Sequence, residues 1–161
     1  MLKVEELTVE AFEPFGRFLN PADCGDPVGS KDDPVQFFPD RILQQFCASN
    51  YAAFNPLVVK PRPFVITLAE IHERTEEVFG GFTKDVCFHV GPAGSNKPPM
   101  DAFRVFRLPA GWWARMKRGV WHHGPFVMGE ETTIGMVVLP PHTYTNDCYV
   151  VELDKAIKIK L

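Results

Sequence analysis

The feature that most constrains this chain is how often proline and glycine interrupt it. Fifteen prolines and twelve glycines are spread over 161 residues, and the apolar segments between them are short. Short apolar segments of this kind suit strands joined by tight turns, because a packed helix needs a longer uninterrupted period. No long helical period and no repeat is visible. The punctuation therefore predicts an all-β domain, folded as an antiparallel barrel or jelly roll.

The expected elements follow from these interruptions. Thr8 can cap a short helix that runs to Phe12 and ends at Pro14. Residues 20–34 are polar and rich in proline, and they predict a loop rather than a domain boundary, so that 1–161 forms a single domain. The expected strands cover residues 35–38, 42–47, 51–59, 63–73, 77–82, 85–90, 102–108, 111–117, 119–123, 132–139, 147–153 and 156–160.

Charge and cysteine usage narrow the class of protein. The formal net charge is −3 and no block of like charges stands out, so a nucleic-acid partner is not expected. No apolar run approaches the roughly 20 residues of a membrane span, and the acidic start of the chain is unlike a signal peptide. The four cysteines are widely spaced and form no C-x-x-C pair. Reduced thiols and a cytoplasmic location are therefore expected.

Polar side chains at the end of one expected strand indicate a site. In PFVITLAEIHER, the alternation places three apolar residues on the same face as Glu70 and His72. Glu77 follows a short turn, so a hairpin can bring it back beside them. A neutral imidazole with carboxylates is a ligand set for a divalent metal such as Zn²⁺, Mn²⁺, Fe²⁺ or Ni²⁺. His122 could complete the set from a distant strand.

His122 lies in the stretch Gly-Val-Trp-His-His-Gly, residues 119–124. If the stretch is a strand, His122 and His123 point to opposite faces, but parity alone does not say which one faces the interior. The residue types leave other interpretations open. His122 could be a structural histidine bonded to a backbone carbonyl, and Glu77 could be a solvated strand end. Residues 73–76 are expected to form a solvated turn.

The two polar stretches together resemble the two halves of the cupin metal site. His72 and Glu77 have the H-x4-E spacing, and Gly119 and His122 have the G-x2-H spacing, while Glu70 stands where cupins carry the first histidine of a pair. The resemblance implies a cupin-like jelly-roll barrel with a short N-terminal helix. It also implies His72, Glu77 and His122 as metal ligands, with His122 facing inward and Trp121 and His123 on the outer face.

Within the cupins, the chain resembles the ureidoglycolate lyase family, formerly called ureidoglycolate hydrolase. LTVEAFEPFG is similar to its opening helix, GVWHHGPF to its V-W-H-H-P-L signature, and residues 146–152 to its closing segment. The resemblance covers most of the chain except about residues 20–60. Further matches are Glu70, His72 and Phe79 on its E-R-H-x4-Q-x-F stretch, and Ala102, Phe103 and Gly111 on its R-A-F…G run.

The resemblance implies an enzyme, a carbon–nitrogen lyase that cleaves ureidoglycolate to glyoxylate and urea in allantoin and purine degradation. Glu70 would take the hydroxyl proton. Lys117 would pair with the substrate carboxylate or protonate the leaving group. Arg104 and Trp121 are assigned to substrate binding. A divalent metal would serve as the cofactor.

The chain departs from the family at several polar positions. Glu77 replaces a glutamine, Lys117 a histidine, and Ile71 and Asp101 replace arginines. These changes keep two alternatives open. One is a metal-dependent cupin isomerase, epimerase or decarboxylase that acts on another small polar acid or sugar, and the other is a non-catalytic metabolite-binding cupin.

A homodimer is also expected. Small jelly rolls expose sheet edges, and pairing across a two-fold axis covers them. The apolar segments Val150–Val151 and Ile157–Ile159 could supply such an edge.

Overall fold

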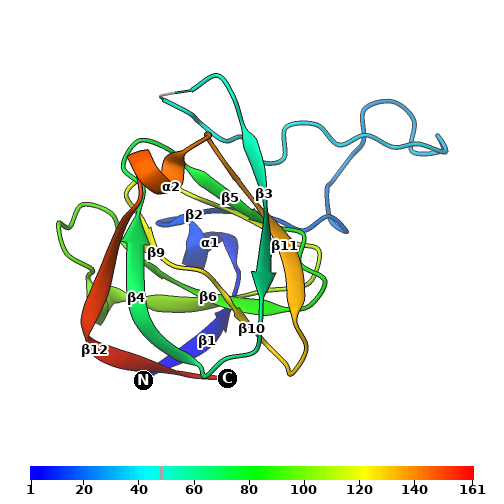
Figure 1. Cartoon of the computed structure of the whole chain (residues 1–161). Coiled ribbons are helices and arrows are strands. Elements are labelled where there is room, and N and C mark those ends of the chain that lie inside the picture. Colours follow the sequence, from blue (N-terminus) through cyan, green and yellow to red (C-terminus); the bar gives the residue numbers. More distant parts are fainter. Residues whose placement is uncertain (48) are drawn as a thin grey trace.

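The computed structural model describes residues 1–47 and 49–161, and it is built from two β-sheets (Figure 1). The larger sheet has the strand order β10-β6-β7-β1-β12-β4-β9, and the smaller has the order β2-β8-β5-β11-β3. The strands of the larger sheet are β1 (Leu2–Glu6), β4 (Val65–Ile71), β6 (Val86–Gly91), β7 (Arg104–Leu108), β9 (Trp121–His122), β10 (Phe126–Val127) and β12 (Tyr149–Lys160). Those of the smaller are β2 (Gly16–Leu19), β3 (Ala53–Val59), β5 (Glu77–Gly80), β8 (Trp113–Met116) and β11 (Thr133–Leu139).

The larger sheet curls until it closes on itself. Besides its place next to β4, β9 pairs with β6, so the pairings run from β6 through β7, β1, β12, β4 and β9 back to β6. Most ladders are antiparallel, but both ladders of β1 are parallel. The predicted all-β jelly roll is confirmed, with β1 as the departure from a purely antiparallel barrel.

Two apolar cores result from this arrangement. The first core lies between the two sheets and includes Phe79 of β5 and Phe88 of β6. The second core receives side chains from every strand of the closed ring, among them Ala69, Cys87 and Trp121. Neighbouring residues such as Cys87 and Phe88 thus enter different cores, because successive side chains of a strand point to opposite faces.

The predicted N-terminal helix exists as one turn, α1 (Val9–Phe12). The Thr8 side chain accepts a hydrogen bond from the backbone N–H of Ala11 at 3.1 Å, which is the expected cap. The helix carries Phe12 into the first core, where the ring is fully buried and packs edge-on against Phe88 and Phe106. Removing a fully buried aromatic side chain costs about 3 kcal/mol of folding free energy. Phe12 therefore holds this helical turn against the first core.

The segment between β2 and β3 is where the expected strands fail. Residues 35–38 and 42–47 form no strand; they contribute only the isolated bridges Val28–Phe37 and Phe46–Thr75. In Figure 1 this segment extends beyond the two sheets. Gln44 and Gln45 instead bond to the smaller sheet individually, through the carbonyls of Glu76 and Val138 and the carboxylate of Glu76. The expected strands 147–153 and 156–160 instead form one long strand, β12, with an irregular register between Glu152 and Ile157.

Two further short helices complete the fold. The single turn α2 (Thr143–Asn146) lies between β11 and β12, and a 3-10 turn covers Met100–Ala102. In Figure 1, α2 lies near the ends of β4 and β12. Among the described residues, no helix is long and apolar enough to cross a membrane.

Candidate active site

A cavity of about 190 Å³ opens between the two sheets, next to α2. Its inner wall is apolar and includes Leu57, Phe79 and Phe88, while its polar groups gather on the side of β4. A mostly apolar cleft with a few converging polar groups is the usual form of a small-molecule site. This cavity is therefore the candidate active site.

Strand pairing brings the polar groups to one place. Glu70 of β4 lies directly opposite His122 of β9 in the antiparallel ladder, and His72 follows the end of β4 on the same face as Glu70. Glu77 opens β5, which belongs to the other sheet. The expected hairpin between β4 and β5 is wrong, because the two strands belong to different sheets, but Glu77 still lies beside the histidines as expected.

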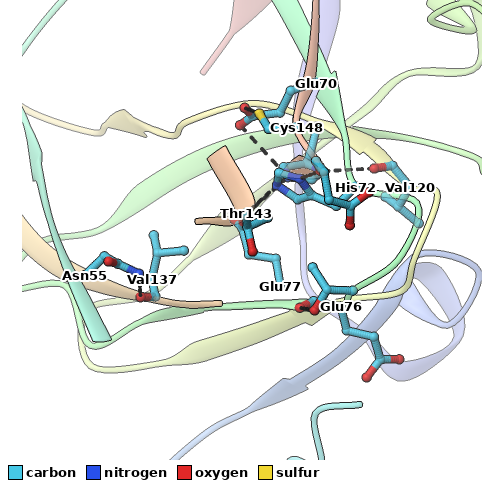
Figure 2. A network of polar contacts seen from close by, with 12 residues as sticks. Asn55, Glu70, His72, Glu76, Glu77, Val120, Val137, Thr143 and Cys148 are labelled. Carbon is cyan, nitrogen blue, oxygen red and sulfur yellow. Dashed lines mark hydrogen bonds and ion pairs between the residues drawn. The ribbon is translucent and has the colours of Figure 1, made fainter. Parts of the chain in front are cut away.

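The three predicted metal ligands form a tight cluster, of which His72 and Glu77 are labelled in Figure 2. Glu77 Oε2 is 3.2 Å from His72 Nε2 and 3.7 Å from His122 Nε2. The two imidazole rings are 5.1 Å apart between centroids. Glu70 stands at the side of the cluster, with Oε1 4.0 Å from His122 Nε2. All four side chains are buried or half-buried.

Backbone carbonyls orient both imidazoles in the same way. His72 Nδ1 lies 2.6 Å from the carbonyl oxygen of Asp147, and His122 Nδ1 lies 2.8 Å from that of Val120. A proton on each Nδ1 donates to its carbonyl, which leaves both Nε2 atoms directed at Glu77. His122 Nε2 is buried and has no hydrogen-bond partner among the described residues. Metal-binding histidines show this pattern, so the residues fit a divalent cation.

The charges of the cluster reinforce one another. Burial acts to lower the pKa of His72, but the hydrogen bond to Glu77 and the charge of that carboxylate outweigh it and raise the pKa to about 9. Burial acts to raise the pKa of Glu77, and the neighbouring His122 and His72 overcome this effect and lower it to about 2. Without a metal, the cluster holds an ionised carboxylate against a protonated imidazole.

Gly119 shapes the approach to β9. Its φ is +75°, which most side chains resist, and its N–H donates to the carbonyl oxygen of His72 at 2.7 Å. The turn therefore ties the start of β9 to the end of β4. It places His122 in the cluster, as the cupin resemblance implied.

The adjacent His123 and Trp121 depart from the expected outer face. His123 lines the cavity, because β9 ends at His122 and the alternation of faces ends with it. Trp121 is buried in the second core, and its Nε1–H donates to the carbonyl oxygen of Ser95 at 3.1 Å. It does not line the cavity. The outer face implied by the resemblance is therefore wrong for both residues, although Trp121 and His122 do point to opposite faces of β9.

Two other residues assigned to the reaction lie elsewhere. Lys117 Nζ donates to the backbone carbonyl of Glu13 at 2.6 Å and to its carboxylate at 3.0 Å. Arg104 pairs with the carboxylate of Glu5 and packs over the ring of Phe106 at 4.8 Å. Neither Lys117 nor Arg104 lines the cavity. Both cations are held by carboxylates of the N-terminal segment, which sequence spacing could not reveal.

Two residues near the end of α2 were missed. The Asp147 carboxylate accepts the backbone N–H groups of Glu73 and Arg74 at 2.9 and 2.8 Å, while its carbonyl orients His72. Cys148 donates to Glu70 Oε2 at 3.3 Å and lines the cavity. Burial, with the charge of Glu70, raises the pKa of this thiol to about 12. The only available signal was the match of residues 146–152 to the closing segment of the family.

The family model and the curated relatives that match this sequence carry the same description. A family model described as ureidoglycolate lyase matches residues 1–160. A ureidoglycolate lyase of Burkholderia cepacia is 34% identical over 137 residues, which cover 76% of this chain and 71% of the relative. One from Burkholderia mallei is 29% identical over 140 residues, or 80% and 76% of the two chains.

A solved structure supports the fold independently. The dTDP sugar isomerase of Desulfovibrio desulfuricans G20 superposes with a TM-score of 0.52 at 15% identity, over 87% of this chain and 83% of that one. At this identity the likeness concerns the fold alone, which agrees with the all-β cupin-like architecture.

Proposed function

The chain belongs to the ureidoglycolate lyase family, and from this premise we propose that it cleaves ureidoglycolate to glyoxylate and urea in the cavity between the sheets. This reaction would place it in allantoin and purine degradation. The observation that carries the proposal is the cluster of Glu70, His72, Glu77 and His122 beside the cavity, in which the buried Nε2 of His122 has no hydrogen-bond partner among the described residues.

The charge of the cavity supports a metal-dependent reaction. Ureidoglycolate is an anion, yet the cavity presents the carboxylates of Glu70 and Glu77, and no lysine or arginine lines it. An anionic substrate beside two carboxylates is unfavourable unless a cation offsets their charge. The described part of the chain offers histidines alone for this purpose, and two of them have the orientation of metal ligands.

His72, Glu77 and His122 would hold the divalent cation. When bound, such a cation supplies positive charge for the substrate carboxylate and lowers the pKa of the adjacent hydroxyl. Asp147 and Val120 keep the two imidazoles in the orientation that binding needs. Zn²⁺, Mn²⁺, Fe²⁺ and Ni²⁺ all accept this set of nitrogen and oxygen donors.

Glu70 is the best-placed proton carrier. Its Oε2 accepts the Cys148 thiol, which leaves Oε1 directed toward the cluster. In the reaction, Glu70 removes the hydroxyl proton, the oxygen forms the carbonyl of glyoxylate, and the carbon–nitrogen bond breaks. The bonding pair stays on the nitrogen, and the same proton passes from Glu70 to this nitrogen to complete urea. This role for Glu70 replaces the one first assigned to Lys117 in protonating the leaving group.

The walls of the cavity complete the proposal. His123 and Tyr144 line it from the segment after β9 and from α2, where their polar atoms can meet the urea group. The apolar wall formed by Leu57, Phe79 and Val137 limits the cavity to a small acid.

A urea-release assay with metal analysis tests this function. The purified protein with its metal should release urea and glyoxylate in equal amounts, and removal of the metal with a chelator should abolish the release. Glu70→Gln should lower kcat at least ~100-fold while the metal content stays unchanged. Absence of urea release from metal-loaded protein would overturn the proposal.

We further propose that the protein is a homodimer. Tyr149 and Val150 of β12 are 63% and 48% exposed. The pairings of β1 with β12 reach only Ile159 and Lys160, so the first half of β12 is bonded to β4 alone among the described strands. An apolar strand edge of this kind favours pairing with a second copy. Light scattering at micromolar concentration should report a dimer, and a monomer would contradict this proposal.

A further inference from the structure

We propose that Cys148, Glu70 and His72 form a second cation position in the cavity, one that takes a thiophilic ion such as Cd²⁺ or Zn²⁺. The position overlaps the cluster of His72, Glu77 and His122 at a single residue, His72. The inference concerns cation binding and does not depend on which reaction the cavity catalyses.

The geometry of the three donors carries the proposal. Cys148 Sγ is 3.3 Å from Glu70 Oε2, and one ligand atom from each of Cys148, Glu70 and His72 lies within 4.8 Å of the other two. Strand register explains this proximity. Tyr149 lies opposite Ile71 and Val150 opposite Glu70, so Cys148 comes just before β12 at the level of His72. The three side chains converge on the cavity from two neighbouring strands (Figure 2).

The donor types distinguish this position from the first. His72, Glu77 and His122 offer only nitrogen and oxygen, which a range of divalent metals accepts. Cys148 adds sulfur, and a thiolate favours thiophilic ions such as Zn²⁺ over Mn²⁺ or Mg²⁺. Binding forms a sulfur–metal bond and breaks the S–H bond, and the proton leaves through the cavity mouth to solvent. Before the ion binds, the carboxylate of Glu70 accepts a hydrogen bond from the S–H group of Cys148. Once the proton has left, this carboxylate is free to bind the ion.

His72 makes the two positions mutually exclusive. Its Nδ1 is engaged by the carbonyl of Asp147, so only Nε2 is available to a cation, and this atom lies 3.2 Å from Glu77. An ion held by Cys148 therefore withdraws His72 from Glu77 and His122. The chain should bind one thiophilic ion in the cavity, and that ion should displace a metal held by the first set.

Cadmium titration of the full chain tests the proposal. The starting protein carries Cys24→Ser and Cys47→Ser, which remove the two cysteines that are not fully buried and lie outside the cavity. Cd²⁺ should produce the ultraviolet charge-transfer absorption of a cadmium–thiolate bond, saturating at one ion per chain. Adding Cys148→Ser should abolish this absorption and weaken Cd²⁺ binding at least tenfold.

The matched control is His122→Ala, which removes a ligand of the first set alone. It should retain the cadmium–thiolate absorption and its stoichiometry. Three results would overturn the proposal: no absorption in the starting protein, absorption that persists in Cys148→Ser, or absorption lost equally in His122→Ala. Cys148→Ala, with melting curves for every variant, separates loss of the ligand from loss of the fold.

Discussion

Glu76 and Glu77 are adjacent in sequence and both lie in buried surroundings, yet they serve opposite purposes. Glu76 Oε1 accepts Arg115 at 2.8 Å, and its Oε2 accepts the backbone N–H of Gln45 at 2.8 Å. Glu77, on the cavity side of the same sheet, meets His72 and His122. One carboxylate is shared by a guanidinium and a backbone amide, and the other by two imidazoles.

The difference shows that the partners of a buried carboxylate, rather than its burial, distinguish structure from chemistry. Arg115 is permanently charged and the backbone amide of Gln45 always donates, so each oxygen of Glu76 already accepts a donor that cannot be exchanged by a change of protonation. Glu76 thereby bonds the segment after β2 to the smaller sheet. Gln44 adds a second contact, because its side chain donates to the backbone carbonyl of Glu76 at 2.7 Å. Histidine partners can lose their protons, and His122 keeps a buried nitrogen free.

The largest loss of activity is expected when the histidine partners of Glu77 are changed. Loaded with Mn²⁺, which the position at Cys148 disfavours, His122→Ala should lose the metal and reduce lyase activity at least ~100-fold, because two ligands hold a cation poorly. The free energy of unfolding of the metal-free protein should change by less than about 2 kcal/mol. Metal content and urea release measured together check this expectation.

His123→Ala is the matched control for this variant, because His123 lines the cavity without joining the cluster. It should retain the metal. If metal content follows His123 instead of His122, or follows neither, the assignment of the cluster is wrong.

The Glu76 side should respond in stability instead. Glu76→Ala leaves Arg115, whose side chain is 15% exposed, without its carboxylate, and should lower the free energy of unfolding by about 3 kcal/mol. Urea release per folded molecule should stay within about twofold of the original, since Glu76 faces away from the cavity. Urea denaturation measures the first quantity. A combined Glu76→Met and Arg115→Met variant should recover part of the lost free energy of unfolding. If Glu76→Ala lowers urea release but not stability, the structural role of Glu76 is wrong.

In the metal-free protein, Glu77 and its partner His72 should contribute to the pH dependence of the free energy of unfolding. The pKa of His72 is raised from 6.5 to about 9, so its contribution is complete below pH 6.5 and is lost as the pH rises through 9. The pKa of Glu77 is lowered from 4.5 to about 2, so its contribution is present above pH 4.5 and is lost as the pH falls through 2.

Denaturant unfolding from pH 6 to pH 10 measures the alkaline decline. Glu77→Gln should flatten it, because His72 then loses the carboxylate that raises its pKa. Glu76→Gln should leave the slope unchanged, although it lowers stability at every pH. An equal slope in wild type and Glu77→Gln would contradict the pairing of His72 with Glu77.

The smallest effect is expected for Lys117→Ala. The Lys117–Glu13 pair is exposed, with 39% and 69% of the two side chains accessible, so its loss should cost no more than about 0.5 kcal/mol. Urea release should be unchanged because Lys117 does not line the cavity. A strong loss of kcat in this variant, with the fold intact, would show that Lys117 takes part in the reaction. The assignment of the active-site residues would then be wrong.

The sequence by itself determined the features that local rules control. Proline and glycine limited all strands except β12 to seven residues or fewer, and Thr8 defined the N-terminal helical turn. The period of two along 63–73 placed Glu70 and His72 on one face. The resemblance then identified His122 and Gly119, and the structure brings His122 to Glu77 as it implied.

Only the tertiary structure decided what stands opposite these faces. It placed β5 in the other sheet, so that Glu77 reaches the histidines from the facing sheet. It also ended β9 at His122, and His123 lines the cavity. It also occupied Lys117 with Glu13 and buried Glu76 beside Arg115. Alternation fixes which side chains share a face, but the partner of that face depends on contacts between residues far apart in sequence, which no local pattern encodes.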